Sequence, residues 1–255
     1  MAFIPPFLPF ISIYCLKVYC VQDNSQSMNC SVKEIAMKIF LDTADVKQIE
    51  KWKETGLIDG VTTNPTHLSK AKGNPRKTVL EICKLLPKGE ISVEVTEKKP
   101  EAVYKQAKAI AKLSKNILVK IPCHRDYYSV IAKLAKERVK MNITLVFTLI
   151  QGLMMCKLGV DYISPFVGRW DDIDVDGVDV LYQLRHMIDE YGFETGLLAA
   201  SIRGVRHFNE AIMAGSDVVT VPISVLEKST DHLLTDQGIE RFDADWKKLG
   251  IRTFP

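Results

Sequence analysis

The chain has 255 residues and a formal net charge of +3, and 47% of its residues are hydrophobic and 25% charged. This composition is typical of a globular protein, and the length accommodates one large domain. The charge is too small to predict a nucleic-acid partner, and the sequence contains neither zinc-type cysteine spacing nor an aromatic and basic RNA motif. The cysteines beyond residue 36 are widely spaced, which predicts reduced thiols in a cytosolic protein.

Residues 1–36 differ in character from all that follows. The stretch 3–21 is apolar, but early prolines oppose a helix and no Lys or Arg precedes it, as a secretory signal requires. It is also marginal in length for a membrane span. A strand pattern begins directly after Met37, so we expect a folded domain over 37–255 without a membrane partner. Residues 1–36 are then an upstream mis-start, a targeting peptide or a disordered tail, of which we favour the first.

Beyond Met37, short apolar runs alternate with amphipathic segments. The runs predict strands at 39–42, 60–63, 91–95, 117–121, 142–147, 162–165, 196–201 and 218–221. Apolar spacing of three and four residues predicts helices at 46–54, 77–86, 101–113, 128–136, 178–190 and 208–214. Eight such units predict an α/β fold, a (β/α)₈ TIM barrel. An open doubly wound sheet is the alternative, but no Gly-rich dinucleotide loop follows the first strand.

One more helix is expected after the eighth unit, over 236–249. Its residues Phe242, Trp246 and Leu249 recur at helical spacing. This spacing predicts a packing face against the barrel or against a neighbouring subunit, rather than a cofactor site.

Lys120 lies in the apolar run 117–121, which is typical of a buried strand. An ammonium is costly to bury unpaired, so such a lysine pairs, moves to a rim or becomes neutral. A neutral lysine is a nucleophile toward carbonyls and can form a Schiff base. The alternative is a lysine at the end of a strand whose ammonium reaches water.

Polar side chains recur at the carboxyl ends of seven of the predicted strands, where a barrel of this kind has its active site. They are Asp42, Asn64, Glu94, Lys120, Asn142 with Thr144, Ser164, and Ser201 with Arg203, and Phe166 follows Ser164 at the same two-residue spacing. Each position has an ordinary alternative, because Asp42 could cap the next helix, Asn64 could form a turn and Glu94 could pair with a surface lysine. Their repetition on successive strands favours one shared pocket.

This set of side chains predicts carbonyl chemistry through an iminium on Lys120. Two acid/base groups are needed, one for the alcohol whose carbon–carbon bond breaks and one for the water lost and added at the lysine. Asp42 and Glu94 are the candidates. Arg169 and Arg203 predict a phosphate site, because guanidinium groups match phosphate oxygens. Their alternative is surface salt bridging.

The chain resembles the short bacterial and archaeal-type transaldolases, a family that includes the fructose-6-phosphate aldolases. The resemblance extends from Met37 to about Gly250. The matching motifs are FLDTA (40–44), GVTTNPT (60–66), VKIP (119–122), NITLVF (142–147), YISPFVGR (162–169), AASIR (199–203) and LTDQGIERF (234–242). Residues 1–36 have no counterpart in the family.

The resemblance implies a role for each candidate residue. Lys120 matches the Schiff-base lysine, Asp42 matches the acid/base for the C4 hydroxyl, and Glu94 with Thr144 matches the pair that activates a water. Matches to substrate-binding positions are Asn64 and Asn142 for the dihydroxyacetone hydroxyls, Ser201, Arg203 and Arg169 for the phosphate, and Ser164 and Phe166 for the pocket wall. The resemblance also implies no metal, no organic cofactor, and homo-oligomers, commonly decamers of two pentamers, with the C-terminal helix crossing between subunits.

Two positions separate the branches of this family. Aldolase members tend to have Gln in place of Glu94 and Tyr in place of Phe166, so both residues favour a transaldolase. The chain departs from the usual family pattern at Thr148, Leu149, Gly152 and Gly204-Val205. The expected changes are altered helix packing near Gly152 and a looser phosphate loop after Arg203.

The sequence therefore predicts a cytosolic transaldolase of the pentose phosphate pathway. It would transfer a dihydroxyacetone unit from fructose 6-phosphate or sedoheptulose 7-phosphate to erythrose 4-phosphate or glyceraldehyde 3-phosphate. The alternatives are an aldolase that releases free dihydroxyacetone and a catalytically silent barrel that binds sugar phosphates.

Overall fold

The computed structural model describes residues 18–22, 28–32, 37–71 and 73–250. The chain divides into two compact units, Met1–Ala36 and Met37–Pro255. In the first unit, β1 (Val18–Gln22) pairs antiparallel with β2 (Met28–Val32). Most of the extension expected over residues 1–36 lies outside the described residues.

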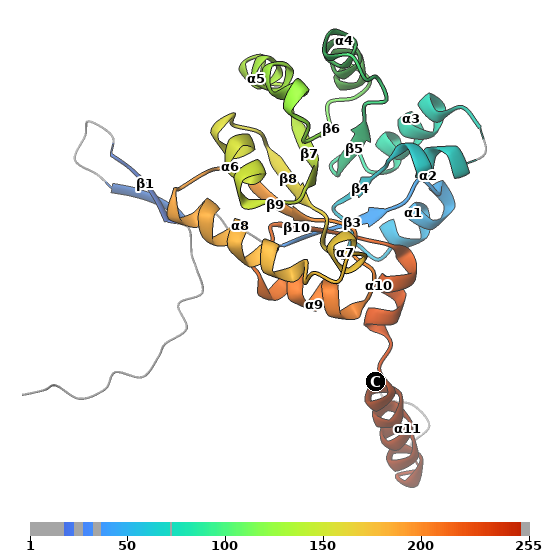
Figure 1. Cartoon of the computed structure of the whole chain (residues 1–255). Coiled ribbons are helices and arrows are strands. Elements are labelled where there is room, and N and C mark those ends of the chain that lie inside the picture. Colours follow the sequence, from blue (N-terminus) through green and yellow to red (C-terminus); the bar gives the residue numbers. More distant parts are fainter. Residues whose placement is uncertain (1–17, 23–27, 33–36, 72, 251–255) are drawn as a thin grey trace, which may run out of the picture. The chain divides into compact units, whose positions relative to one another are not determined.

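The second unit contains a closed barrel of parallel strands (Figure 1). Their order around the barrel is β10-β3-β4-β5-β6-β7-β8-β9, which is sequential and closes between the first and last strands. The strands are β3 (Lys38–Asp42), β4 (Gly60–Thr62), β5 (Glu90–Glu94), β6 (Ile117–Pro122), β7 (Met141–Val146), β8 (Tyr162–Pro165), β9 (Gly196–Ala199) and β10 (Val218–Val221). The predicted (β/α)₈ barrel is confirmed.

Helices alternate with these strands along the chain. The predicted helices are observed as α1 (Val46–Lys53), α3 (Pro75–Leu85), α4 (Pro100–Ala111), α5 (Tyr128–Lys136), α8 (Val178–Glu190), α9 (Val205–Met213) and α11 (Leu233–Lys248). The prediction missed α2 (Pro65–Lys70), η1 (Arg125–Tyr127), α6 (Leu149–Lys157), α7 (Val167–Asp171) and α10 (Ile223–Thr230). Of these, α2 and α7 are too short to display an apolar repeat, and α6 is apolar around most of its circumference.

Side-chain caps explain where several helices begin. Asp45 accepts the N–H groups of Lys47 and Gln48 at the start of α1. At the start of α6, Thr148 and Gln151 form a reciprocal capping box. Because these donors have no partner inside the helix, each cap stabilises its helix by about 1 kcal/mol.

The core has two layers, which follow from the alternation of side chains along each strand. The larger layer lies between strands and helices and includes Ile39, Leu41, Ile117 and Val119. A smaller cluster fills the barrel, formed by Phe40, Leu118, Leu198, Ala200 and Val218. A side chain two residues beyond Phe40 or Leu118 therefore also faces the interior, near the carboxyl end of the barrel.

Three cysteines of this unit, Cys83, Cys123 and Cys156, are buried and free. Within the described residues, no helix has both the length and the apolar character needed to cross a membrane. The same residues contain no group of three or more His, Cys, Asp or Glu side chains placed to hold a metal ion.

Candidate active site

A pocket of about 230 Å³ opens at the carboxyl ends of the barrel strands. It collects most of the residues that the sequence singled out, from separate strands and loops of the barrel. They are Asp42, Asn64, Lys120, Asn142, Ser164, Phe166, Arg169, Ser201 and Arg203. Glu94 and Thr144 do not line the pocket, but both lie on strands that flank Lys120.

Lys120 is buried on β6, with 5% of its surface exposed. Its Nζ lies 3.3 Å from Oε2 of Glu94, and the two residues are register partners across β5 and β6. On the other side, Lys120 is the register partner of Asn142. The ammonium also lies 5.9 Å from the centre of the Phe166 ring. Lys120 is thus a buried amine beside a carboxylate, and Glu94 does not pair with a surface lysine.

Asp42 ends β3, and its Oδ1 accepts a hydrogen bond of 2.9 Å from the hydroxyl of Thr62. The Nε2 atom of His67 lies 3.4 Å from the same oxygen. Burial raises the pKa of Asp42, but the hydrogen bond from His67, the charges of His67 and Lys120, and the Thr62 bond outweigh it and hold the pKa below its usual range. Because Asp45 caps α1, Asp42 is not needed as a cap and remains available to the pocket.

Asn142 is fully buried and bonded through both ends of its amide. Its Nδ2 donates to the hydroxyl of Ser92 at 3.1 Å, and its Oδ1 accepts from the hydroxyl of Ser164 at 2.6 Å. These bonds fix the amide orientation, and they leave the second Nδ2 hydrogen for a ligand.

Asn64 is the N-cap of α2, and it is not part of a turn. Its Oδ1 accepts the backbone N–H of His67 at 2.8 Å. The cap occupies the oxygen, so the amide nitrogen of Asn64 is the part left to donate into the pocket.

Thr144 is buried on β7, and its hydroxyl has no hydrogen-bond partner among the described residues. A buried hydroxyl without a partner costs free energy, so such a group is typical of a site that binds water or substrate.

The anion-binding candidates lie at the ends of β8 and β9. The Arg169 guanidinium lies 5.0 Å from the centre of the Phe166 ring. Arg203 forms a two-pronged ion pair with Asp172, with Nη2 and Oδ2 2.7 Å apart, and the guanidinium holds the pKa of Asp172 below its usual range. A bound phosphate would therefore compete with Asp172 for the Arg203 fork.

A close approach of α7 to the β9 loop shapes this end of the pocket. The N–H of Gly168 donates to the carbonyl of Ser201 at 3.0 Å, and Ser201 adopts a φ of +61°. A Cβ at Gly168 would collide with that carbonyl oxygen, so the approach requires glycine. Since φ is positive at a residue other than glycine, the Ser201 backbone is strained, as is common at functional sites.

Comparison with known proteins identifies the family. The family model described as Transaldolase/Fructose-6-phosphate aldolase matches residues 39–252. The chain belongs to this family. A probable transaldolase of Sinorhizobium medicae (strain WSM419) is 44% identical over 214 residues, which cover 84% of this chain and 98% of the relative. The sequence-based recognition is confirmed.

Other relatives agree with this transaldolase family membership. A probable transaldolase of Petrotoga mobilis (strain DSM 10674 / SJ95) is 45% identical over 212 residues, covering 83% of this chain and 96% of the relative. Among solved structures, a flavocytochrome b2 variant with sulfite bound matches with a TM-score of 0.52 at 14% identity, over 85% of this chain and 63% of that one. That likeness concerns the fold alone.

The sequence analysis missed several polar residues of this transaldolase-family barrel. Thr62, Ser92 and Thr220 point into the interior, where Thr62 and Thr220 share a hydrogen bond of 2.5 Å. Thr62 lies two residues before Asn64, and Ser92 lies two residues before Glu94. Because side chains alternate along a strand, this spacing could have predicted that Thr62 and Ser92 also point into the barrel. No local pattern relates His67 or Asp172 to their partners, because each contact depends on how a helix is placed.

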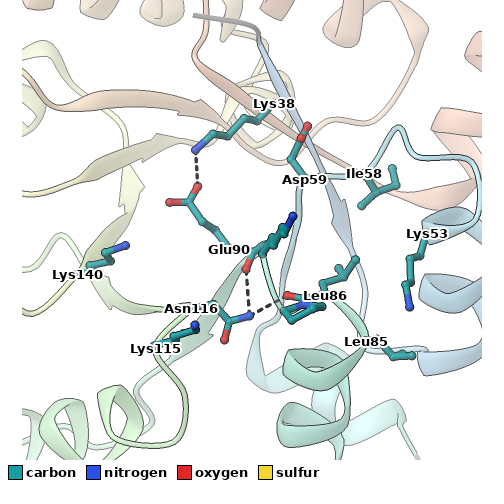
Figure 2. A pocket seen from close by; sticks show the side chains of 13 residues that line it. Lys38, Lys53, Ile58, Asp59, Leu85, Leu86, Glu90, Lys115, Asn116 and Lys140 are labelled. Carbon is teal, nitrogen blue, oxygen red and sulfur yellow. Dashed lines mark hydrogen bonds and ion pairs between the residues drawn. The ribbon is translucent and has the colours of Figure 1, made fainter. Parts of the chain in front are cut away.

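A larger pocket of about 530 Å³ lies at the opposite, amino-terminal end of the barrel strands (Figure 2). Lysines gather around it, namely Lys38, Lys53, Lys88, Lys115 and Lys140. The Lys38 ammonium lies 2.7 Å from Oε2 of Glu90, and both groups bond the hydroxyl of Tyr162, whose pKa is raised to about 12, mainly by burial. The other four lysines are exposed, so this pocket has no lysine as deeply buried as Lys120.

Proposed function

We propose that this protein is a transaldolase that transfers a dihydroxyacetone unit between sugar phosphates through a Schiff base on Lys120. The observation that carries the proposal is the buried amine of Lys120, 3.3 Å from the Glu94 carboxylate in a pocket that also contains Asp42. Family membership supports the same reaction.

In the donor half-reaction, Lys120 attacks the C2 ketone of fructose 6-phosphate or sedoheptulose 7-phosphate. Glu94 and Thr144 hold the water that carries protons to and from the carbinolamine as water leaves and the iminium forms. Asp42 takes the C4 hydroxyl proton while the C3–C4 bond breaks, and the electron pair of that bond flows into the iminium to give an enamine.

In the acceptor half-reaction, the enamine carbon attacks the aldehyde of erythrose 4-phosphate or glyceraldehyde 3-phosphate. Asp42 returns its proton to the new hydroxyl, and addition of water releases the product ketose from Lys120. Asn64 and Asn142 hold the hydroxyls of the three-carbon unit through their amide N–H groups. Ser201, Arg203 and Arg169 hold the phosphate, and Ser164 and Phe166 form the pocket wall.

The test is a product assay on the purified protein with fructose 6-phosphate, with and without erythrose 4-phosphate. A transaldolase produces sedoheptulose 7-phosphate only when the acceptor is present. Free dihydroxyacetone accumulating without acceptor would instead establish the alternative, a fructose-6-phosphate aldolase. A protein that binds fructose 6-phosphate without product or imine formation would be a catalytically silent barrel.

Glu94 and Phe166 favour transfer over release. A carboxylate can move a proton through water, whereas an amide cannot, so Glu94→Gln combined with Phe166→Tyr is expected to raise the release of free dihydroxyacetone relative to transfer. An unchanged product ratio in the double variant would refute the assignment of reaction preference to these positions.

We further propose a homo-oligomer, a pentamer or decamer, located in the cytosol. None of the side chains of α11 is buried in the single chain, and Leu233, Leu234, Ile239 and Phe242 are each more than half exposed. Several large apolar side chains left exposed on one helix are typical of a subunit interface.

A further inference from the structure

His67 contacts the candidate acid/base residue from a helix that the sequence analysis did not predict. It lies in the first turn of α2, where the Asn64 cap bonds its backbone N–H. Its Nε2 is 3.4 Å from Oδ1 of Asp42, and its side chain is 27% exposed. One pocket residue, Asn64, thus holds the backbone of His67, and the imidazole of His67 contacts a second pocket residue, Asp42.

The two oxygens of Asp42 are differently occupied. Oδ1 accepts a hydrogen bond from the hydroxyl of Thr62 and lies near Nε2 of His67. No described residue forms a hydrogen bond with Oδ2. With the Thr62 hydroxyl bonded to Oδ1 and Nε2 of His67 beside the same atom, Oδ2 is the oxygen left to accept a proton from a ligand in the pocket.

Charged groups of several elements surround His67. It lines a second pocket of about 700 Å³ together with Asp45 and Lys47 at the start of α1, Lys70 of α2 and Glu81 of α3. On the other side, the active-site pocket contributes Asp42, Lys120, Arg169 and Arg203. His67 therefore stands between two openings and has water access, while its contact with Asp42 is partly shielded.

We propose that His67 is a positioning residue for Asp42, donating Nε2–H to Oδ1 so that Oδ2 remains ionised and aimed at the C4 hydroxyl of the sugar. This role rests on the proposed transaldolase activity. The C4 proton moves to Oδ2 of Asp42 during cleavage and returns from it to the new hydroxyl during transfer, so His67 undergoes no net change. A lowered pKa of Asp42 agrees with this arrangement.

The test compares His67→Leu, which removes the donor, with His67→Gln, which keeps one. We expect His67→Leu to lower kcat for transfer roughly tenfold with little change in KM, and to move the acid limb of the kcat/KM profile to higher pH. The pH shift follows because Asp42, without its donor, is protonated more readily. His67→Gln should recover part of kcat. The matched control is His186→Leu on α8, an exposed histidine outside both pockets, which should leave all values unchanged.

Borohydride trapping of the Lys120 imine separates this proposal from the proposed function. Trapping should be normal in His67→Leu, because Lys120 is intact. Wild-type protein that neither transfers nor traps would overturn both the activity and this role. Wild-type activity with unchanged kcat and pH profile in His67→Leu would overturn the role alone. A lower melting temperature without a shift of the kcat/KM pH profile in either variant would also overturn the positioning role. That result would mean that His67 serves the packing of α2.

Discussion

Lys120 faces the candidate active-site pocket because of its position in β6. Leu118, two residues earlier, belongs to the interior cluster, whereas Val119 belongs to the layer beneath the helices. Alternation along the strand therefore directs Lys120 inward, to a level where Glu94 and Asn142 are its register partners. A charged residue in an apolar strand is thus buried with a carboxylate beside it.

Replacing Lys120 by Met removes the amine while keeping an unbranched side chain of similar length. We expect activity to fall roughly a thousandfold or more, since no other lysine among the described residues lines this pocket to form the imine. The check is borohydride reduction in the presence of fructose 6-phosphate, followed by mass spectrometry, which should detect no adduct on the variant. An adduct equal to that of the wild type would refute the lysine assignment.

Arg203→Lys keeps the charge but removes the planar fork that pairs with Asp172 and, in the proposed reaction, with phosphate. We expect KM for fructose 6-phosphate to rise about tenfold, which corresponds to about 1.4 kcal/mol of binding, with a smaller change in kcat. Arg206→Lys is the matched control, because Arg206 pairs with Asp176 and does not line the pocket. Equal effects of the two substitutions on KM would contradict a phosphate-binding role.

At the scale of elements, the short helices α2 and α7 both contribute to the candidate active site. Each follows closely after the end of a strand. Arg169 of α7 lines the pocket, and His67 of α2 contacts the pocket residue Asp42. Short helices of this kind give no periodic signal, so the sequence analysis predicted Arg169 without α7 and missed both α2 and His67.

Packing between α6 and α8 depends on Gly152. A Cβ at this position would collide with Cδ2 of Leu184, which is fully buried. We expect Gly152→Ala to lower the free energy of unfolding by about 1 kcal/mol, because the Leu184 side chain must leave its position and the gain in helix propensity only partly offsets this cost. Chemical denaturation of the single variant measures the effect.

A double-mutant cycle with Leu184→Val identifies the cause. Valine lacks the colliding Cδ2 atom, so the double variant should be less destabilised than the sum of the two single variants. Additive effects would mean that the Leu184 side chain is not the obstacle.

At the scale of the whole molecule, α11 carries apolar side chains, such as Ile239 and Phe242, that are more than half exposed. If a second copy covers them, Phe242→Asp combined with Ile239→Asp should reduce the mass measured by light scattering to that of a monomer, while the circular dichroism of the barrel persists. Glu240→Lys on the same helix is the control and should keep the oligomer. A monomeric wild-type protein would refute the proposed assembly.

The order of strands and helices and the position of polar residues at strand ends were predictable from the sequence. Both depend on short-range patterns, because apolar alternation specifies a strand and its last residues lie at the mouth of a barrel. The prediction was confirmed for the barrel and for the family, and helix boundaries differed by only a few residues where the apolar repeat was long enough.

Only the tertiary structure decided which atoms of these residues are already bonded. Oδ1 of Asn64 caps α2, the Arg203 fork holds Asp172, and Oδ1 of Asp42 meets Thr62 and His67. The partners of Asp42 and Arg203 come from other segments of the chain, and these contacts form only where the fold brings donor and acceptor to about 3 Å from each other. The sequence thus determined which chemical groups gather at the mouth of the barrel, and the fold determined which of their atoms remain free to bind and react.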